Sequence, residues 1–238
     1  MPRLKSNTSN IIRDKIIADI QNYEISVGDV VSEVEVARTL GYSRSPVREA
    51  INELIQMGLL ERTSTKVIVK AVTYKDFEEF TQSKIAIESA SVQIIIKNNL
   101  FTKEQKIIFN EYLDKYKEAI IFSDYQTAFE YDSLFHRQIV IAANNERFLE
   151  FYDRIELQSK RLRWLTIFTA QNYHKLLNEH ISIYDALCEK NCSTCIDAVY
   201  LHLNNEHENY KIILKGKQWS NILSSMRVLK SNKDRLII

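Results

Sequence analysis

The chain has 238 residues, of which 45% are hydrophobic and 26% charged, and its net charge is +1. This length and balance suit a globular protein of one or two domains with a full hydrophobic core. No N-terminal segment resembles a signal peptide, and no apolar run approaches the roughly 18 residues of a membrane span, so we expect a cytoplasmic protein without a membrane partner. The charge balance decides nothing about nucleic acid, because a basic patch can lie within a neutral average.

The chain contains only 4 glycines and 2 prolines. Strands need tight turns that these two residue types usually supply. The low counts therefore predict a mainly α fold.

The three cysteines, Cys188, Cys192 and Cys195, lie within eight positions of one another. A Cys-x-x-Cys pair occurs in redox and zinc sites, but here no βαβ pattern surrounds it and no second pair exists. We interpret all three as ordinary thiols.

The first part of the chain has the pattern of three short helices and a hairpin. Residues 1–72 are therefore predicted to form a winged helix-turn-helix domain. The predicted helices cover Ile11–Ile20, Glu33–Leu40 and a segment from Ser43 to about Met57, and strand-like alternation follows over Lys66–Lys70.

Local signals mark the ends of two of these helices. Gly41 stands directly after the second helix, where a left-handed residue is needed. Ser43 is placed to cap the third helix. Pro46 falls in the first turn of that helix, where a missing N–H does no harm. The proline therefore predicts a helix start.

From Tyr74 onward no strand pattern recurs, and long amphipathic segments follow one another. Two begin with capping-box spacing, Thr102-x-x-Gln105 and Ser123-x-x-Gln126. We expect an all-helical bundle over residues 73–222 and a tail over residues 223–238. The predicted helices of the bundle are Lys75–Asn98, Thr102–Ile121, Asp124–Ala143, Glu146–Thr169, Gln171–Lys190 and Ser193–Leu214.

Arg44, Ser45 and Arg48 lie at the start of the third predicted helix, which would be the recognition helix of the motif. Such a helix enters the major groove and contacts bases with its N-terminal residues. The two arginines are four apart and share a face, and each can bond a guanine or a phosphate. Two arginines at a helix start are, on their own, more often solvated charges than DNA contacts. Residues 1–72 hold ten Lys/Arg against nine Asp/Glu, so we expect weak binding by one domain and tighter binding by a dimer.

Asp132, His136, His180 and His202 form a second set of candidates, in the helical half. Asp132 and His136 are i and i+4 on one predicted helix, so their side chains can converge on one ion. His180 and His202 lie among apolar residues of two later helices. A shared metal explains three histidines on apolar faces, whereas a lone histidine more often is a satisfied polar residue; His174 and His207 are interpreted in that way. The donors suit zinc, nickel, iron, manganese or cobalt.

The segment "VSEVEVARTLGYSRSPVREAINELIQMGLLER" resembles the winged helix-turn-helix of GntR-type bacterial transcriptional regulators, and "SRSPVREAINEL" is its most specific part. The resemblance covers about the first 72 residues and implies that the three residues at the helix start contact operator DNA. The chain departs from the family at two places. Thr65 and Lys66 stand where the wing usually has a glycine, and Val34 stands where some relatives have a DNA-contacting arginine.

The helical half resembles the FCD domain of the FadR subgroup of these regulators, over about residues 75–222. The family's aspartate and three histidines match Asp132, His136, His180 and His202 one by one, and "AANNERF" also matches. The resemblance implies a divalent transition metal, such as zinc, nickel, manganese or iron, that helps to bind a small organic acid.

The cation that would meet this acid is less defined by the sequence. Lys84 stands where relatives have an arginine, four residues before the glutamate matched by Glu88. Arg161 and Arg163 are further candidates for binding the effector.

The main hypothesis is thus a ligand-responsive regulator that binds double-stranded operator DNA as a homodimer. One alternative is a metal sensor, or a structural metal without an organic effector. Another is a metalloenzyme in which Glu179 or Asp185 serves as the base. The N-terminal DNA-binding pattern and the lack of a nucleophile motif or a Gly-rich phosphate loop argue against an enzyme.

Overall fold

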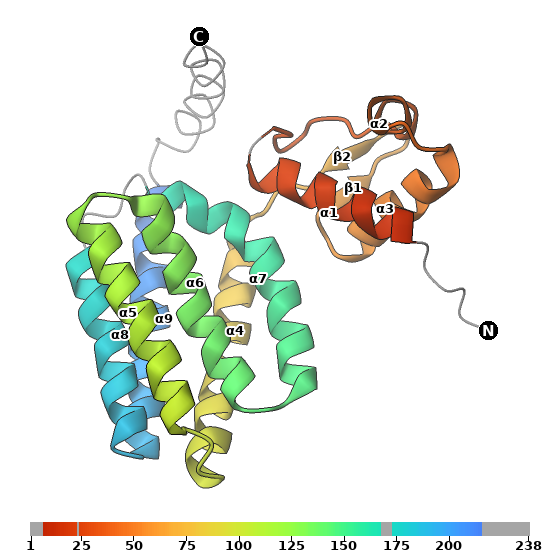
Figure 1. The fold of residues 1–238 in the computed structure, drawn as a ribbon. Coiled ribbons are helices and arrows are strands. Elements are labelled where there is room, and N and C mark those ends of the chain that lie inside the picture. The colour runs from red at the N-terminus through yellow and green to blue at the C-terminus, as the bar shows by residue number, and fades with distance from the viewer. Residues whose placement is uncertain (1–6, 23, 168–172, 216–238) are drawn as a thin grey trace. The chain divides into compact units, whose positions relative to one another are not determined.

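The structure is a computed structural model that describes residues 7–22, 24–167 and 173–215; at 7, 161–167, 209–210 and 212–215 only the backbone is described. The chain divides into two compact units, with the boundary between Thr73 and Tyr74. The mainly α fold is confirmed, with a winged helix-turn-helix followed by an all-helical bundle (Figure 1). The predicted tail, 223–238, lies outside the described residues. Among the described helices, none combines the length and the apolar character needed to cross a membrane.

The first unit packs three helices around a small apolar core and adds a two-stranded wing. Its buried centre comes from one stripe of α1, with Ile12 and Ile16 at 0% and 2% exposure, and from α3, with Ile51 and Leu54 both at 0%. The elements are α1 (Asn7–Gln21), α2 (Glu33–Leu40), α3 (Arg44–Gln56), β1 (Leu60–Arg62) and β2 (Val67–Val69).

The wing is an antiparallel hairpin in which Leu60 faces Val69 and Arg62 faces Val67. Val67 and Val69 are buried on one side, as the alternation predicted. Thr63 closes the turn by accepting a hydrogen bond at its hydroxyl from the backbone N–H of Lys66 (3.1 Å).

The end of α2 and the start of α3 lie at the predicted residues. Gly41 ends α2 in the left-handed region, at φ 71°. Ser43 is the N-cap residue of α3, although its side chain makes no capping hydrogen bond, and Pro46 lies in the first turn. Before α2, Ser32 caps the helix by accepting from the N–H of Glu35 (3.4 Å).

The second unit is an antiparallel arrangement of long helices (Figure 1). α5 packs against α6, α8 against α9, and α4 against α6, α7 and α9. The bounds are α4 (Tyr74–Lys97), α5 (Lys103–Ile121), α6 (Tyr125–Ala142), α7 (Glu146–Ile167), α8 (Tyr173–Cys188) and α9 (Cys192–Lys215).

The cap of α6 differs from the prediction. Ser123 was expected to open a capping box, but its backbone is left-handed, with φ 57°. The N-cap is Asp124, which accepts from the N–H of Thr127 at 3.1 Å. Because a short carboxylate at the next position caps equally well, the spacing alone misplaced the cap by one residue. The other predicted cap, Thr102, does accept from the N–H of Gln105 (3.4 Å).

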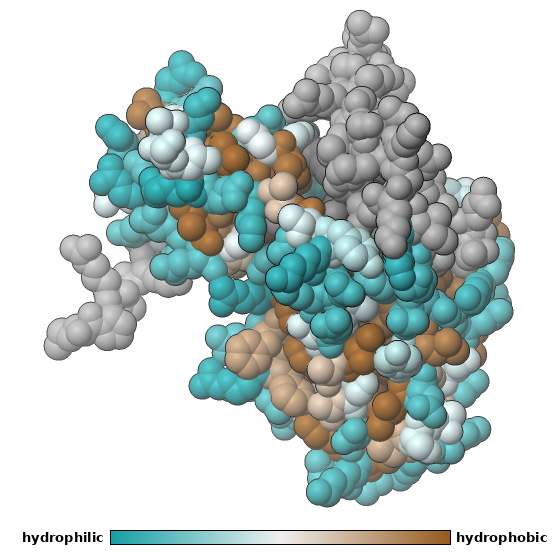
Figure 2. Space-filling model, turned by 180° about the vertical axis from the view of Figure 1, so that it is seen from behind, coloured by the Kyte–Doolittle hydropathy of each residue, from teal (hydrophilic) through white to brown (hydrophobic). Residues whose placement is uncertain are grey.

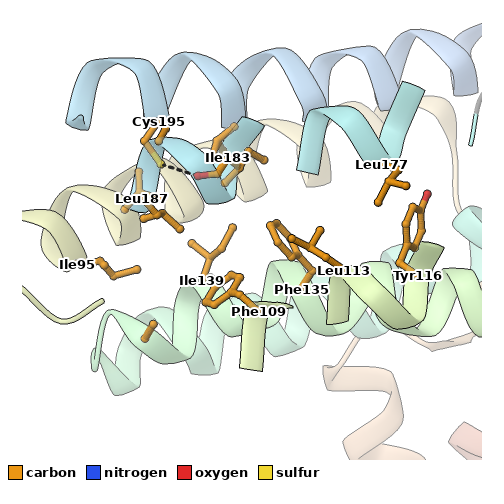
Figure 3. Close-up of a cluster of buried hydrophobic side chains, with 14 of the residues drawn as sticks. Ile95, Phe109, Leu113, Tyr116, Phe135, Ile139, Leu177, Ile183, Leu187 and Cys195 are labelled. Carbon is orange, nitrogen blue, oxygen red and sulfur yellow. Dashed lines mark hydrogen bonds between the residues drawn. The ribbon is translucent and has the colours of Figure 1, made fainter. Parts of the chain in front are cut away.

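The bundle core is a continuous apolar layer contributed by α4, α5, α6, α8 and α9 (Figure 3). Phe109 and Phe135 meet edge to face, with ring centroids 5.1 Å apart. The Cys195 thiol is buried and donates to the carbonyl of Ile183 at 3.8 Å. Burial and the nearby Cys192 raise the pKa of Cys195 to about 12. All three cysteines are free thiols.

The surface is mixed in character. On the face shown in Figure 2, hydrophobic side chains reach the surface of both units among hydrophilic ones. In the bundle, Phe122 is 75% exposed and Phe151 is 57% exposed.

Candidate metal centre and nucleic-acid interface

Four donor side chains converge inside the bundle from three helices. Asp132 and His136 lie one turn apart on α6, His180 lies on α8, and His202 lies on α9. All four are buried, at 0–6% exposure, and one ligand atom from each lies within 4.8 Å of all the others. The structure thus brings together the whole set that the sequence predicted.

The nitrogen atoms face one another at short distances. The Nε2 atom of His136 lies 2.9 Å from that of His202 and 3.1 Å from that of His180. His180 Nε2 is also 3.3 Å from Asp132 Oδ1. Two imidazole nitrogens bound at a right angle to one ion, each at about 2.1 Å, would be roughly 3.0 Å apart. The donor set therefore fits a transition metal in both chemistry and spacing.

Carboxylates lie behind two of the rings. Glu88 Oε2 on α4 is 2.8 Å from His136 Nδ1, and Glu179 Oε2 on α8 is 2.9 Å from His202 Nδ1. An ionised carboxylate only accepts, so Nδ1 carries the proton in both rings. Each Nε2 is then left with a lone pair pointing at the other donors, as in histidines that bind metals.

Further hydrogen bonds hold these carboxylates. Tyr152 on α7 donates its hydroxyl to Glu88 Oε1 (3.1 Å), and Asn205 on α9 donates its amide to Glu179 Oε1 (2.7 Å). Tyr152 and Glu88 are fully buried. Burial, followed by the charge of Glu88, raises the pKa of Tyr152 well above its ordinary value, so the phenol stays a donor.

The titration of the site follows from burial and pairing. Burial opposes ionisation of Glu88, but its pKa is lowered by the His136 ring and then by Lys84. Burial likewise opposes ionisation of Glu179, whose pKa is lowered by its hydrogen bond to His202. The pKa of His202 is lowered by burial, although Glu179 acts against this. Deprotonated carboxylates and a neutral His202 are the forms that a metal needs.

Aromatic rings enclose the site on one side. Phe135, next to His136 in sequence, contacts the ring of His180 at a centroid distance of 4.8 Å. Tyr116 meets His180 edge to face at 5.2 Å. Both aromatic residues belong to the buried layer shown in Figure 3. The apolar packing therefore fixes the ring of His180, and it limits access of water from this side.

Lys84, predicted to bind an effector, already has a partner. Its Nζ lies 3.3 Å from Glu156 Oε2, and the two side chains are 5% and 12% exposed. The same Nζ lies 5.5 Å from the ring centroid of Tyr152. The side chains of the other two candidates, Arg161 and Arg163, lie outside the described residues, although their backbone belongs to α7.

At the start of α3, the three predicted DNA-contacting residues are all exposed. The side chains of Arg44 and Arg48 are 62% and 59% exposed. Both approach Glu33 at the start of α2: Arg48 Nε donates to Glu33 Oε2 at 3.2 Å, and Arg44 Nη2 lies 3.9 Å from the same oxygen. A shared carboxylate thus holds the two guanidinium groups on one surface, where they remain available to DNA. Val34 beside them is 58% exposed.

The sequence did not predict that Glu88 and Glu179 accept hydrogen bonds from the ligand histidines. Glu179 was considered as a base in an enzyme, yet it orients His202, which is 23 residues away. Glu88 was named only as a match to a family glutamate. A signal for Glu179 exists in hindsight, because Asn205, its second partner, lies one turn after His202 on α9.

Comparison with known proteins supports both halves of the chain. Residues 8–68 match the family described as bacterial regulatory proteins of the gntR family, and residues 79–205 match the FCD domain. The HTH-type transcriptional regulator YdhC of Bacillus subtilis is 25% identical over 84% of this chain and 89% of its own length. A probable repressor of the D-xylose utilization operon of Paenarthrobacter nicotinovorans is 28% identical over 65% of this chain and 67% of its own.

Among solved structures, Escherichia coli McbR/YncC has the same fold. It is 16% identical in sequence and superposes with a TM-score of 0.73, over 86% of this chain and 97% of its own.

Proposed function

We propose a regulatory mechanism for this chain, which belongs to the GntR family of bacterial regulatory proteins and carries an FCD domain. It is a transcriptional regulator and not an enzyme, so the metalloenzyme hypothesis is set aside. In our proposal it binds double-stranded operator DNA as a homodimer. Its bundle holds one divalent transition metal and, next to it, a small organic acid that changes the affinity for DNA.

The observation that carries the proposal is the crowding of imidazole lone pairs. Glu88 and Glu179 place the protons on Nδ1, so the Nε2 atoms of His136 and His202, which are 2.9 Å apart, both carry lone pairs. Two lone pairs at this distance repel, and only a proton or a metal ion between the donors relieves the repulsion. Since His180 and Asp132 add two more donors at the same point, a metal ion satisfies all four.

The metal would supply a positive charge with coordination positions left for a carboxylate oxygen. The chain's own residues hold the four donors, fix their tautomers and exclude water on the side of Phe135 and Tyr116. Lys84 is neutralised by Glu156 at 3.3 Å, so in our proposal the carboxylate is attracted by the metal centre more than by this lysine. The name of the xylose-operon relative, a probable transcriptional repressor, supports control of an operon.

The metal assignment is tested by elemental analysis of the full chain after mild dialysis. We expect about one divalent ion per chain in the wild type and loss of most of it in His180→Ala. His174→Ala serves as a control, because His174 lies exposed on the same helix. Wild-type protein that folds stably, contains no metal and takes up neither zinc nor nickel would refute the site.

The DNA assignment is tested with operator duplexes selected from random sequences. Each of Arg44→Ala and Arg48→Ala should weaken specific binding by about 1–3 kcal/mol where the arginine bonds a base. An arginine that contacts phosphate would weaken binding to all sequences alike and reduce the salt dependence. Unchanged operator affinity in the double variant would remove both residues from the interface.

A further inference from the structure

His207 on α9 makes an unusual set of contacts inside the bundle. Its ring stacks on Phe77, with centroids 5.3 Å apart and an interplanar angle of 3°. Its Nε2 lies 3.3 Å from the hydroxyl of Tyr74. His207 is only 9% exposed, and within the described part of the chain its Nδ1 has no hydrogen-bond partner. From the sequence, His207 was interpreted as a polar residue with satisfied hydrogen bonds, but one of its two ring nitrogens has no partner among the described residues.

The two residues that His207 contacts, Tyr74 and Phe77, lie in the chain directly after the boundary between the two units. Tyr74 is the first residue of α4 and of the bundle, and Phe77 follows within the first turn. The N-terminal segment that forms the DNA-binding unit ends at Thr73, directly before Tyr74. The contact therefore fixes the first turn through which the bundle is covalently joined to the DNA-binding unit.

The same helix also carries a metal ligand. His202 and His207 are five residues apart on α9, which is about 7.5 Å along the axis at 1.5 Å per residue. A helix segment of this length moves as a rigid body, so a shift of His202 toward or away from its three fellow donors also moves His207. α9 is one of the main packing partners of α4.

The contact is also weak enough to respond to such a shift. A stacked ring and a single 3.3 Å hydrogen bond hold His207, and its other nitrogen gains nothing from staying buried. A leucine or phenylalanine would fill the same space against Phe77 without leaving a polar atom unpaired. Packing alone therefore does not account for a histidine here.

We propose that His207, through Tyr74 and Phe77, is the contact that passes the state of the metal centre to the DNA-binding unit. The inference rests on the proposed function and adds the route of its regulation. When the four donors gather around the metal, α9 is held in one position, and His207 holds the first turn of α4. Without the metal, α9 relaxes, the stack loosens, and the chain leading to the DNA-binding unit is less restrained.

The test measures operator affinity of the full-length protein with zinc and after chelation, and takes the ratio as the coupling. The probe is zinc alone. Zinc affinity is measured separately by competition with a chromophoric chelator. We compare the wild type with His207→Ala, with His207→Phe, which keeps the stack, and with Tyr74→Phe, which keeps the ring. His174→Ala is the matched control, because its histidine is exposed.

We expect His207→Ala to bind zinc within about twofold of the wild type, while its coupling ratio falls toward one. Tyr74→Phe and His207→Phe should each lose part of the coupling. Amide hydrogen exchange gives a second readout: zinc should slow exchange at residues 74–78 in the wild type but not in His207→Ala. If His207→Ala does not fold, the coupling ratios of His207→Phe and Tyr74→Phe decide whether this contact carries the coupling.

The failures are distinguishable. Coupling that stays at the wild-type ratio in every variant, with zinc bound, would overturn the role of His207 and leave the proposed function standing. Wild-type protein that binds zinc but binds operator equally with and without it would overturn this inference alone, whereas wild-type protein that takes up no zinc would overturn the proposed metal centre and this inference together.

Discussion

At the scale of single residues, the candidate centre consists of two layers of side chains with different tasks. Asp132 and the three histidines offer electron pairs, whereas Glu88 and Glu179 decide which nitrogen of two rings offers them. Such outer carboxylates hold a ring in orientation and raise its basicity. Their loss should weaken the centre even when every ligand is present.

Glu179→Gln should lower the affinity for zinc by about 10- to 100-fold, because a neutral amide orients His202 less firmly. In the wild type, the side-chain amide of Asn205 donates to Glu179 at 2.7 Å. In the variant, the new glutamine side chain still contacts Asn205. The measurement is competition with a chromophoric chelator. Glu189→Gln, at an exposed position just after the same helix, is the control and should have wild-type affinity. Equal affinities for the two variants would show that Glu179 does not support the centre.

Lys84 and Glu156 form a buried pair whose two members depend on each other. Lys84→Met removes the cation that faces the buried carboxylate of Glu156 and should cost about 3–5 kcal/mol in the free energy of unfolding. The double variant Lys84→Met with Glu156→Leu should recover most of this loss, because apolar side chains can replace a buried pair. Urea denaturation of both proteins checks the expectation. A single variant as stable as the wild type would show that Lys84 is free to serve another partner.

At the scale of elements, the short helices of the first unit depend on how they end. α2 has only eight residues, and a helix of this length is marginal without its caps and tertiary packing. Ser32 caps its start, and Gly41 turns the chain at its end with φ 71°. This turn places α3, and with it Arg44 and Arg48, against α2.

Gly41→Ala should destabilise the protein by about 1 kcal/mol, since a left-handed conformation costs an L-residue about that much. Apart from Gly41 and its two neighbours in the chain, no heavy atom of the described residues lies within 4 Å of the position that a Cβ would occupy, so the cost is backbone strain and not a clash. Gly41→Asn should cost less, because asparagine tolerates this conformation better. Thermal denaturation compares the two. An alanine variant as stable as the wild type would contradict the role of the turn.

The sequence allowed most elements to be predicted, but not how side chains pair between helices. Periodicity and caps are local, so Glu33–Leu40 was predicted at its observed bounds, and the alternation predicted over Lys66–Lys70 contains the observed strand Val67–Val69. The cap of α6 was misplaced because Ser123 and Asp124 are both good capping residues. The link from Glu179 to His202 joins two helices, and no local pattern encodes it. The four donors were predicted because an i, i+4 pair and a family resemblance both indicated them.

At the scale of the whole molecule, regulation requires that binding in the bundle and binding of DNA by the first unit are energetically coupled. The two units meet in the chain at Thr73 and Tyr74, where α4 begins without an intervening glycine. In our proposal a homodimer presents two recognition helices to half-sites about one DNA turn apart, roughly 34 Å. Any change in the path of the chain at this joint would then alter the fit to both half-sites.

Such coupling must be reciprocal. If zinc changes operator affinity by some factor, typically about 5- to 150-fold, operator must change zinc affinity by the same factor. Zinc competition on free and operator-bound protein measures the second factor, and operator titration with and without zinc measures the first. Two factors that differ beyond error would mean that the effects arise from different species, such as monomer and dimer.

The most direct test of the metal centre is X-ray absorption at the zinc edge of the full-length, zinc-loaded protein. Binding by Asp132 and three histidines predicts a nearest layer of nitrogen and oxygen at about 2.0–2.2 Å, with the outer scattering that imidazole rings produce. The same spectrum should lose imidazole scattering in His180→Ala. A layer of sulfur at about 2.3 Å would place the metal on Cys188, Cys192 or Cys195 and would contradict the account.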